Sequence, residues 1–159
     1  MEFSIREARA ADVEIIASNN AAMAVETEGK TLDPDVIGPG VARLLDEPGR
    51  GRYWVAEARG QVVGQLMITH EWSDWRNGDV WWIQSVYVHP DWRRKGVFSA
   101  LYQRVQTLAE AEPDVIGIRL YVEENNTRAQ RTYHALGMSR PNYVVMESMF
   151  GDTTDKSRD

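Results

Sequence analysis

The chain has 159 residues, 43% of them hydrophobic and 26% charged, and its formal net charge at pH 7 is −6. This length and mixture are typical of one globular domain with a buried core. No run of 18 apolar residues and no apolar stretch near the start occurs, so we expect neither a membrane span nor an export signal. The absence of cysteine excludes disulfides and thiol nucleophiles, and a cytoplasmic location is expected. The acidic balance disfavours nucleic-acid binding, which needs an extended basic face.

The first half of the chain predicts a strand, two helices and a hairpin. Residues 3–6 predict a short strand, and residues 11–25 carry apolar side chains at helical spacing. Glycines, prolines and acids in residues 26–40 favour a loop, with a short helix near Val36 to Leu45. Two β-rich runs, residues 52–58 and 61–72, meet at a turn and predict a hairpin.

The second half of the chain predicts alternating strands and helices. The nearly continuous apolar run that ends at Val88 predicts a central strand buried on both faces. After it we expect a helix that Pro113 ends, a strand over residues 115–122, a helix capped by Asn125 or Asn126 and closed by Gly137, and a last strand over residues 143–149. This order indicates a mixed α/β sheet. We expect a single domain over residues 1–150 and a polar, disordered tail over residues 151–159.

A basic turn, Arg93-Arg94-Lys95-Gly96, lies between the strand ending at Val88 and a helix that begins near Val97. A helix start offers backbone N–H groups and a partial positive charge, which together can hold an anion. Gly96 lets a ligand approach the backbone without meeting a Cβ atom, and an arginine can hold two phosphate oxygens. The turn therefore fits a diphosphate, although a basic turn that only faces water fits these residues equally well. The glycine patterns of nucleoside triphosphatases and dinucleotide dehydrogenases do not occur.

Residues 85–101, "SVYVHPDWRRKGVFSAL", resemble the acyl-CoA-binding motif of the GNAT superfamily of N-acetyltransferases. That motif, Arg/Gln-x-x-Gly-x-Gly/Ala after a strand ending in Val-x-Pro, is filled by Arg93 to Phe98, with Phe98 in place of the second small residue. The resemblance implies an acetyl-CoA site between the strand ending at Val88 and the strand of residues 115–122. It implies that the pantetheine arm pairs with the backbone of Val86, Tyr87 and Val88. The pyrophosphate is then expected beside Arg93, on Arg94, Lys95, Gly96, Val97, Phe98 and Ser99.

A second signature of the same superfamily is similar to residues 120–138. Its positions are taken by Leu120, Val122, Asn126, Ala129, Tyr133 and Gly137, with Met138 where phenylalanine is usual. Together the two signatures imply a GNAT-like α/β (α+β) fold, with a mixed, mostly antiparallel sheet of six to seven strands and about four helices on its faces. They also imply that Asn126 and Ala129 help to bind the cofactor and that Tyr133 does so too, as the acid that protonates the leaving thiolate. Packing of a helix onto the sheet is the structural alternative for Tyr133.

The reaction needs a group that takes a proton from the attacking amine, because an amine with a lysine-like pKa of about 10.4 is protonated at neutral pH. Many members of the superfamily carry a glutamate at the position of Gln84, and an amide cannot accept this proton. Glu26 and Glu28 fall where the superfamily builds the lid of its acceptor site, so both are base candidates, and Glu28 is also a candidate substrate contact. Other candidates are Glu71, Asp74, His70 and a chain of water molecules.

Four of the six tryptophans lie between residues 71 and 82. We expect Trp72 or Trp75 to line the acceptor site together with Gln84, since a ring face can hold a cationic amine. Trp81 or Trp82 is expected to fill the core. The three histidines lack metal-ligand spacing, so no metal is expected, and His89 is interpreted as a turn residue at the end of a strand.

The sequence therefore predicts an N-acetyltransferase that moves an acetyl group from acetyl-CoA to a primary amine of a small molecule, by direct attack in a ternary complex. The alternative is a sensor module that binds acetyl-CoA without catalysis, which Gln84 and Phe98 favour. We expect no nucleic-acid or membrane partner, and the resemblance allows a homodimer.

Overall fold

The computed structural model of the chain describes residues 2–151, so the expected tail falls outside the described residues except for Gly151. The described chain divides into two compact units, one ending at Tyr121 and one beginning at Val122. Its α-helices are α1 (Val13–Glu28), α2 (Pro34–Asp46), α3 (Val97–Ala111) and α4 (Thr127–Ala135).

The first unit is built on a mixed sheet of order β1-β2-β3-β4-β5. Three neighbouring pairs are antiparallel, and the pair of β4 and β5 is parallel. The strands are β1 (Ser4–Glu7), β2 (Gly51–Ala58), β3 (Gln61–Ser73), β4 (Gly78–Val88) and β5 (Val115–Leu120). The expected α/β class is confirmed, but the expectation of six to seven strands is wrong, because residues 2–151 form five.

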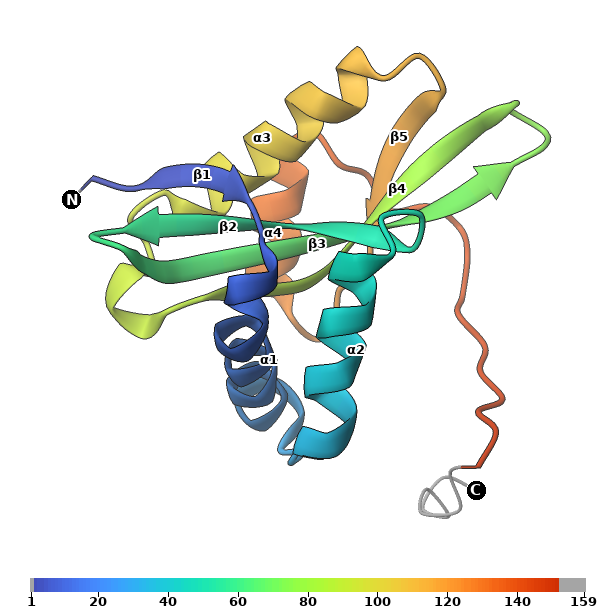
Figure 1. The fold of residues 1–159 in the computed structure, drawn as a ribbon. Coiled ribbons are helices and arrows are strands. Elements are labelled where there is room, and N and C mark those ends of the chain that lie inside the picture. The colour runs from blue at the N-terminus through green and yellow to red at the C-terminus, as the bar shows by residue number, and fades with distance from the viewer. Residues whose placement is uncertain (1, 152–159) are drawn as a thin grey trace. The chain divides into compact units, whose positions relative to one another are not determined.

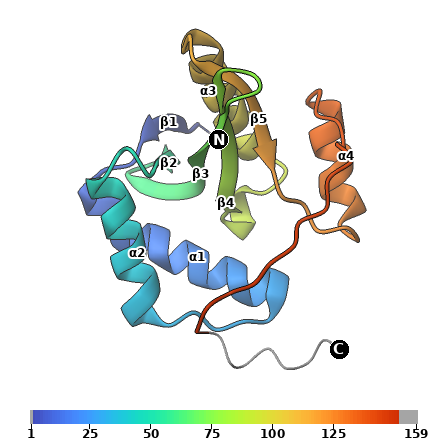
Figure 2. The ribbon, with the colours of Figure 1, turned by 90° about the vertical axis from the view of Figure 1, so that its right-hand side faces the viewer.

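Two helices cover one face of this sheet and one covers the other, as Figures 1 and 2 show: α1 and α2 lie on one side and α3 on the opposite side. Ile16 of α1 and Val41 of α2 are buried against Tyr53 and Val55 of β2. Burying these apolar side chains between helices and sheet is the main force that holds the layers together.

The helix α3 approaches the sheet closely at Gly64. A Cβ atom at this position would lie 2.7 Å from Cγ1 of Val97 and 3.5 Å from Cδ1 of Leu101. Both side chains are buried in the first turns of α3. The missing side chain at Gly64 therefore sets how closely the start of α3 lies to β3.

Two sequence-based predictions about local structure are wrong. Residues 26–40 are not one loop, because α1 continues to Glu28 and α2 begins at Pro34, leaving residues 29–33 between them. Gly29 ends α1 in the left-handed conformation with φ +62°, and Asp33 caps α2 by accepting from the N–H of Asp35. The glycines and prolines thus mark helix ends and a helix interior rather than a continuous loop.

The second error concerns residues 143–149, which form no strand and expose large apolar side chains such as Met146. Apolar alternation alone does not make a strand, because a strand also needs a neighbour that pairs with its backbone. The described part of the chain supplies no such pairing for these residues.

The second unit contains α4, whose two ends follow the sequence prediction. The side-chain oxygen of Asn126 accepts from the N–H of Ala129 at 3.1 Å, which caps the helix start. At the other end Gly137 adopts φ +90°, and the N–H of Met138 donates to the carbonyl of Tyr133 at 3.1 Å. These contacts are those of a left-handed helix cap, which favours glycine.

Candidate functional site

The strand β4 has an open edge at its carboxyl end. Its pairing with β5 runs from Asp79 to Ile83 and stops there, whereas its pairing with β3 continues to Val88. Figure 2 shows β4 continuing beyond the end of β5. Within residues 2–151, no strand pairs with residues 84–88 on that side. The backbone of Val86 to Val88 can therefore pair with an extended ligand, as a strand edge does in β-augmentation.

A β-bulge interrupts β4 at the beginning of this open edge. Two steps along β3, from Gln65 to Met67, correspond to three steps along β4, from Tyr87 back to Gln84. Ser85 adopts φ +50°, a left-handed conformation that is uncommon outside glycine. Bulges redirect backbone groups and are frequent beside functional sites. This one sets which amide groups of residues 85–88 face the open edge.

The basic turn leads from β4 into α3 through two left-handed residues, Arg94 with φ +60° and Gly96 with φ +79°. Gly96 is the N-cap of α3, and the carbonyl of Gly96 accepts from the N–H of Ala100. A Cβ atom at Gly96 would meet no other atom within 4 Å, so glycine is needed here for its backbone conformation. The first turn of α3, beginning at Val97, follows directly and presents the positive end of the helix dipole.

The cations of this turn do not share one role. Arg93 is turned toward α1: its Nη2 lies 2.7 Å from the Glu26 carboxylate, and its Nε donates to the carbonyl of Val88 at 2.9 Å. Lys95 donates from Nζ to the carbonyl of Asp91 at 2.6 Å. Arg94 is exposed. Arg93 thus connects the end of β4 to α1, while Arg94 extends into solvent beside the start of α3.

The two acids expected to act as a base lie on the last turn of α1 rather than in a loop. Glu26 is held by Arg93, as described above. Glu28 is exposed and is the last residue of the helix. The two base candidates therefore differ: Glu26 is paired with Arg93, whereas Glu28 is exposed to solvent.

Gln84 faces the same side of the sheet as α1 and α2. It is paired with Met67, whose side chain packs on the core cluster under these helices. Its Nε2 donates to Oγ1 of Thr69 at 2.6 Å, which fixes the orientation of the amide. Trp82, two residues earlier, lies on this face as well, and its Nε1 donates to Glu71, which is also paired with Arg119.

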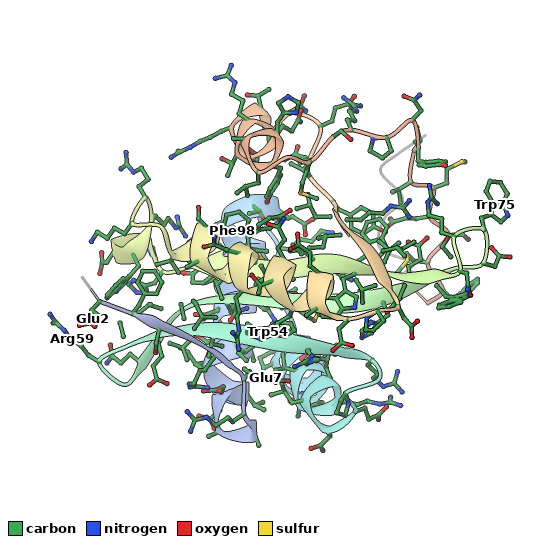
Figure 3. All side chains as sticks on the ribbon, turned by 90° about the horizontal axis from the view of Figure 1, so that it is seen from above. Glu2, Glu7, Trp54, Arg59, Trp75 and Phe98 are labelled. Atoms are coloured by element: carbon green, nitrogen blue, oxygen red, sulfur yellow. The ribbon has the colours of Figure 1, made fainter. Side chains whose placement is uncertain are left out.

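The structure does not bring Trp72 and Trp75 to Gln84. Trp72 pairs with Asp79 and belongs to the face that carries Trp81 and His70, opposite to Gln84. Trp75 lies at the hairpin tip, 92% exposed, and Figure 3 shows it far along the sheet from Phe98 on α3. The six residue steps from Gly78 to Gln84 alone span about 20 Å in an extended strand. Trp82 is the tryptophan that shares the face of Gln84, and Trp81 is buried at 3% exposure.

Tyr133 lies on α4, one turn after Ala129 and on the same helix face. It is half-buried, and this burial raises the pKa of the Tyr133 phenol above its ordinary value of 10.0. A phenol with a raised pKa stays protonated at neutral pH and can donate a proton. Asn126, expected to contact the cofactor, uses its side-chain oxygen to cap this helix.

A buried group of amide side chains escaped the sequence reasoning. Gln65 of β3 is fully buried and hydrogen-bonded to Asn19 and Asn20 of α1. The only signal was the Asn-Asn pair inside an apolar helical pattern, where two buried amides are unexpected.

No group of three or more metal-binding side chains gathers in residues 2–151. In the same part of the chain, no helix combines the length and the hydropathy needed to cross a membrane.

Comparisons with known proteins point to acetyltransferases. A sequence model of the acetyltransferase (GNAT) family matches residues 21–138. Thialysine N-epsilon-acetyltransferase of Bos taurus is 31% identical over 98 residues, which are 61% of this chain and 52% of that protein. The chain thus spans about half the length of this curated relative.

Solved structures agree with this match. The crystal structure of "a possible acetyltransferase" from Clostridium difficile 630 is 44% identical with a TM-score of 0.87, covering 94% of this chain and 98% of that one. Glucosamine-6-phosphate N-acetyltransferase from Arabidopsis thaliana has a TM-score of 0.74 at 18% identity, covering 94% of this chain and 99% of that one. The second likeness shows the fold alone.

Proposed function

Because the chain belongs to the acetyltransferase (GNAT) family, we propose that it transfers an acetyl group from acetyl-CoA to the primary amine of a small molecule in a ternary complex. The observation that carries this proposal is the open edge of β4 next to the left-handed turn at Arg94 and Gly96. An extended chain and a diphosphate are the two parts of coenzyme A that need such partners.

The donor is held by backbone groups more than by side chains. The amide groups of the pantetheine arm pair with Val86 to Val88 at the open edge. The pyrophosphate lies on the first turn of α3, over residues 94–99, where helix-start N–H groups and the dipole favour an anion. The exposed Arg94 adds a charge-assisted contact to the phosphates.

The reaction forms a bond between the amine nitrogen and the thioester carbon and then breaks the bond between that carbon and sulfur. The ammonium form of the amine loses one proton to a base before the attack, and its nitrogen loses a second proton as the amide forms. The departing thiolate of coenzyme A takes one proton from an acid, so one proton is released to solvent per turnover. Tyr133 is the acid in this proposal, because it occupies the position that the family uses and its phenol carries a proton at neutral pH. Burial raises the pKa of this phenol above 10.0, so the proton is retained over the whole neutral range.

Gln84 orients the amine rather than deprotonating it. Its Nε2 is engaged with Thr69, which directs Oε1 as an acceptor for an N–H of the incoming amine. An amide takes no proton, so the base lies elsewhere. Of the two acids in the last turn of α1, Glu28 is the one that no arginine holds among the described ion pairs, and it is our candidate; a water chain is the other route for the proton.

The acceptor class is proposed from two observations. The chain has a formal net charge of −6, which favours the approach of cationic amines. The curated relative carries the name of an enzyme that acetylates thialysine, a small molecule with a primary amine. A small-molecule amine is therefore preferred over a protein amine.

A catalytically silent acetyl-CoA sensor is the second candidate, and the amide at Gln84 favours it because a glutamate is usual there. The two functions are separated by measuring release of free CoA thiol across a panel of primary amines, with a thermal shift on adding acetyl-CoA. The enzyme releases thiol only when acceptor is present. Stabilisation by acetyl-CoA without turnover on any amine supports the sensor and overturns the enzyme.

A further inference from the structure

A chain of buried amide hydrogen bonds joins α1 to the bulge in β4. Gln65 is 0% exposed, and both N–H groups of its amide are used: Nε2 donates to Oδ1 of Asn20 at 2.9 Å and to the carbonyl of Ser85 at 3.3 Å. Its Oε1 accepts from Nδ2 of Asn19 at 3.0 Å. Every polar atom of this side chain thus has a partner, and one of these partners is the backbone of the bulge.

Ser85, the left-handed residue of the bulge, is also close to Tyr53 of β2. Nδ2 of Asn20 donates to the Tyr53 hydroxyl at 3.1 Å. The Ser85 side chain lies within hydrogen-bonding reach of this hydroxyl, and burial of Tyr53 raises its pKa above the ordinary value. Ser85 therefore accepts a hydrogen bond from Gln65 through its carbonyl, and its side chain lies next to the Tyr53 hydroxyl that Asn20 contacts.

We propose that this group of side chains, Asn19, Asn20, Gln65 and Tyr53, positions the bulge at Ser85 so that the open edge of β4 matches the pantetheine arm of the acyl donor. The inference rests on the proposed function, because it assigns the open edge to that ligand. The four residues are positioning residues, since they act through the backbone of β4 and not by touching the ligand.

The physical reason is the conformation of the bulge. A non-glycine residue with positive φ is unfavourable unless its surroundings impose it. The carbonyl of the left-handed Ser85 accepts from the buried amide of Gln65, and leaving such an acceptor without a partner is costly. The buried Tyr53 hydroxyl lies beside the Ser85 side chain and belongs to the same network through Asn20. Without these groups the extra residue in β4 has no fixed location, and the amides of residues 86–88 no longer hold one register.

The helix α1 also holds the other end of the segment 85–88, at Val88. Its Glu26 holds Arg93, which donates to the carbonyl of Val88. Residues 85–88 are therefore fixed at both ends by one helix, through neutral amides at the bulge and through an ion pair at the strand end. Both attachments lie on β4, and neither uses the first turn of α3.

Because the network acts on β4 and not on the start of α3, it should affect a ligand that uses both segments more than a ligand that uses α3 alone. Coenzyme A uses the open edge and the α3 start, whereas ADP has the diphosphate without the pantetheine arm. Dissociation constants of both ligands are measured by calorimetry and competition for the wild type, for Gln65→Met and for Tyr53→Phe. Tyr53→Phe removes a single hydroxyl and keeps the ring, so it reports on the network even if Gln65→Met fails to fold. Val41→Ala, a buried position in α2, is the control for general destabilisation.

We expect both network variants to bind coenzyme A about tenfold more weakly, the effect of one or two lost hydrogen bonds, with ADP affinity changed less than about twofold. Val41→Ala is expected to lower the melting temperature and leave the ratio of the two affinities unchanged. Equal weakening of both ligands, or no weakening of either, overturns the positioning role. If the wild type binds neither ligand, the proposed function itself fails, and this outcome is distinct from the others.

Discussion

The guanidinium of Arg93 lies 2.7 Å from the carboxylate of Glu26, although 67 positions separate them in the sequence. From the motifs alone, Arg93 is expected beside the pyrophosphate and Glu26 is expected to be a candidate for the catalytic base. In the structure they instead hold the end of β4 against α1. The pair is half-exposed, so it contributes at most about 1 kcal/mol to the free energy of unfolding. Its main effect is to fix the position of the end of β4 relative to α1.

The two acids in the last turn of α1, Glu26 and Glu28, should therefore behave differently in catalysis. We expect Glu26→Gln to leave the pH dependence of kcat/KM unchanged, because its carboxylate is committed to Arg93. Glu28→Gln should lower kcat/KM by about 10²-fold, the usual contribution of a general base. Steady-state rates between pH 6 and pH 9 test both. If Glu28→Gln kept the rate and the pH profile of the wild type, Glu28 would not be the base, and a chain of water molecules would carry the proton to solvent.

Removal of the Tyr133 hydroxyl tests the proton donor. Tyr133→Phe should reduce kcat by about 10²-fold or more and leave acetyl-CoA affinity nearly unchanged. Burial raises the pKa of this phenol above 10.0, so the wild type keeps its acid at every pH below that value, and loss of activity through its ionisation occurs only above pH 10. Normal turnover in the variant would assign Tyr133 to packing alone.

Substitution at Gly96 should weaken both the fold and the donor site. Gly96→Ala places a Cβ atom on a residue with φ +79°, which costs about 1–2 kcal/mol in the left-handed region. Gly40→Ala is the matched control, because Gly40 lies within α2 with no atom near its Cβ position, and alanine favours a helix by about 0.5–1 kcal/mol. Urea unfolding should move in opposite directions for the two variants. Movement in the same direction would refute the conformational argument.

The buried Asp12 predicts a pH-dependent part of the stability. Its carboxylate is held by two hydrogen bonds from Arg6, at 2.8 and 2.9 Å, and chiefly for this reason the pKa of Asp12 lies below its ordinary 3.8. A lowered folded-state pKa stabilises the protein above pH 3.8, and this contribution disappears as pH falls through the folded value. Asp12→Asn should therefore lose about 1–3 kcal/mol at pH 7, with the loss shrinking below pH 3.8. A loss that stays constant down to pH 2.5 would contradict this assignment.

Local patterns predicted most elements because their signals lie within short windows of sequence. The hairpin of β2 and β3, the apolar run of β4 and the caps of α4 at Asn126 and Gly137 all depend on neighbouring residues. The prediction of a strand at residues 143–149 was wrong because a strand also needs a pairing partner, and that partner is not visible in a short window of sequence.

The candidate site was predictable only in part. The turn at Gly96 carries a motif, and its left-handed conformation follows from the glycine. Ser85 adopts a similar conformation with no residue-type signal, and its carbonyl accepts from Gln65, which lies on another strand and far away in the sequence. The partner of Arg93 was equally hidden, since it depends on how α1 lies against β4.

Calorimetric titration with acetyl-CoA tests the central claim that the edge of β4 and the start of α3 together hold an acyl-CoA. We predict saturable binding of one ligand per chain with a dissociation constant of about micromolar order, weakened by Arg94→Gln and by added salt. Absence of binding heat together with an unchanged melting temperature at millimolar acetyl-CoA would contradict the account.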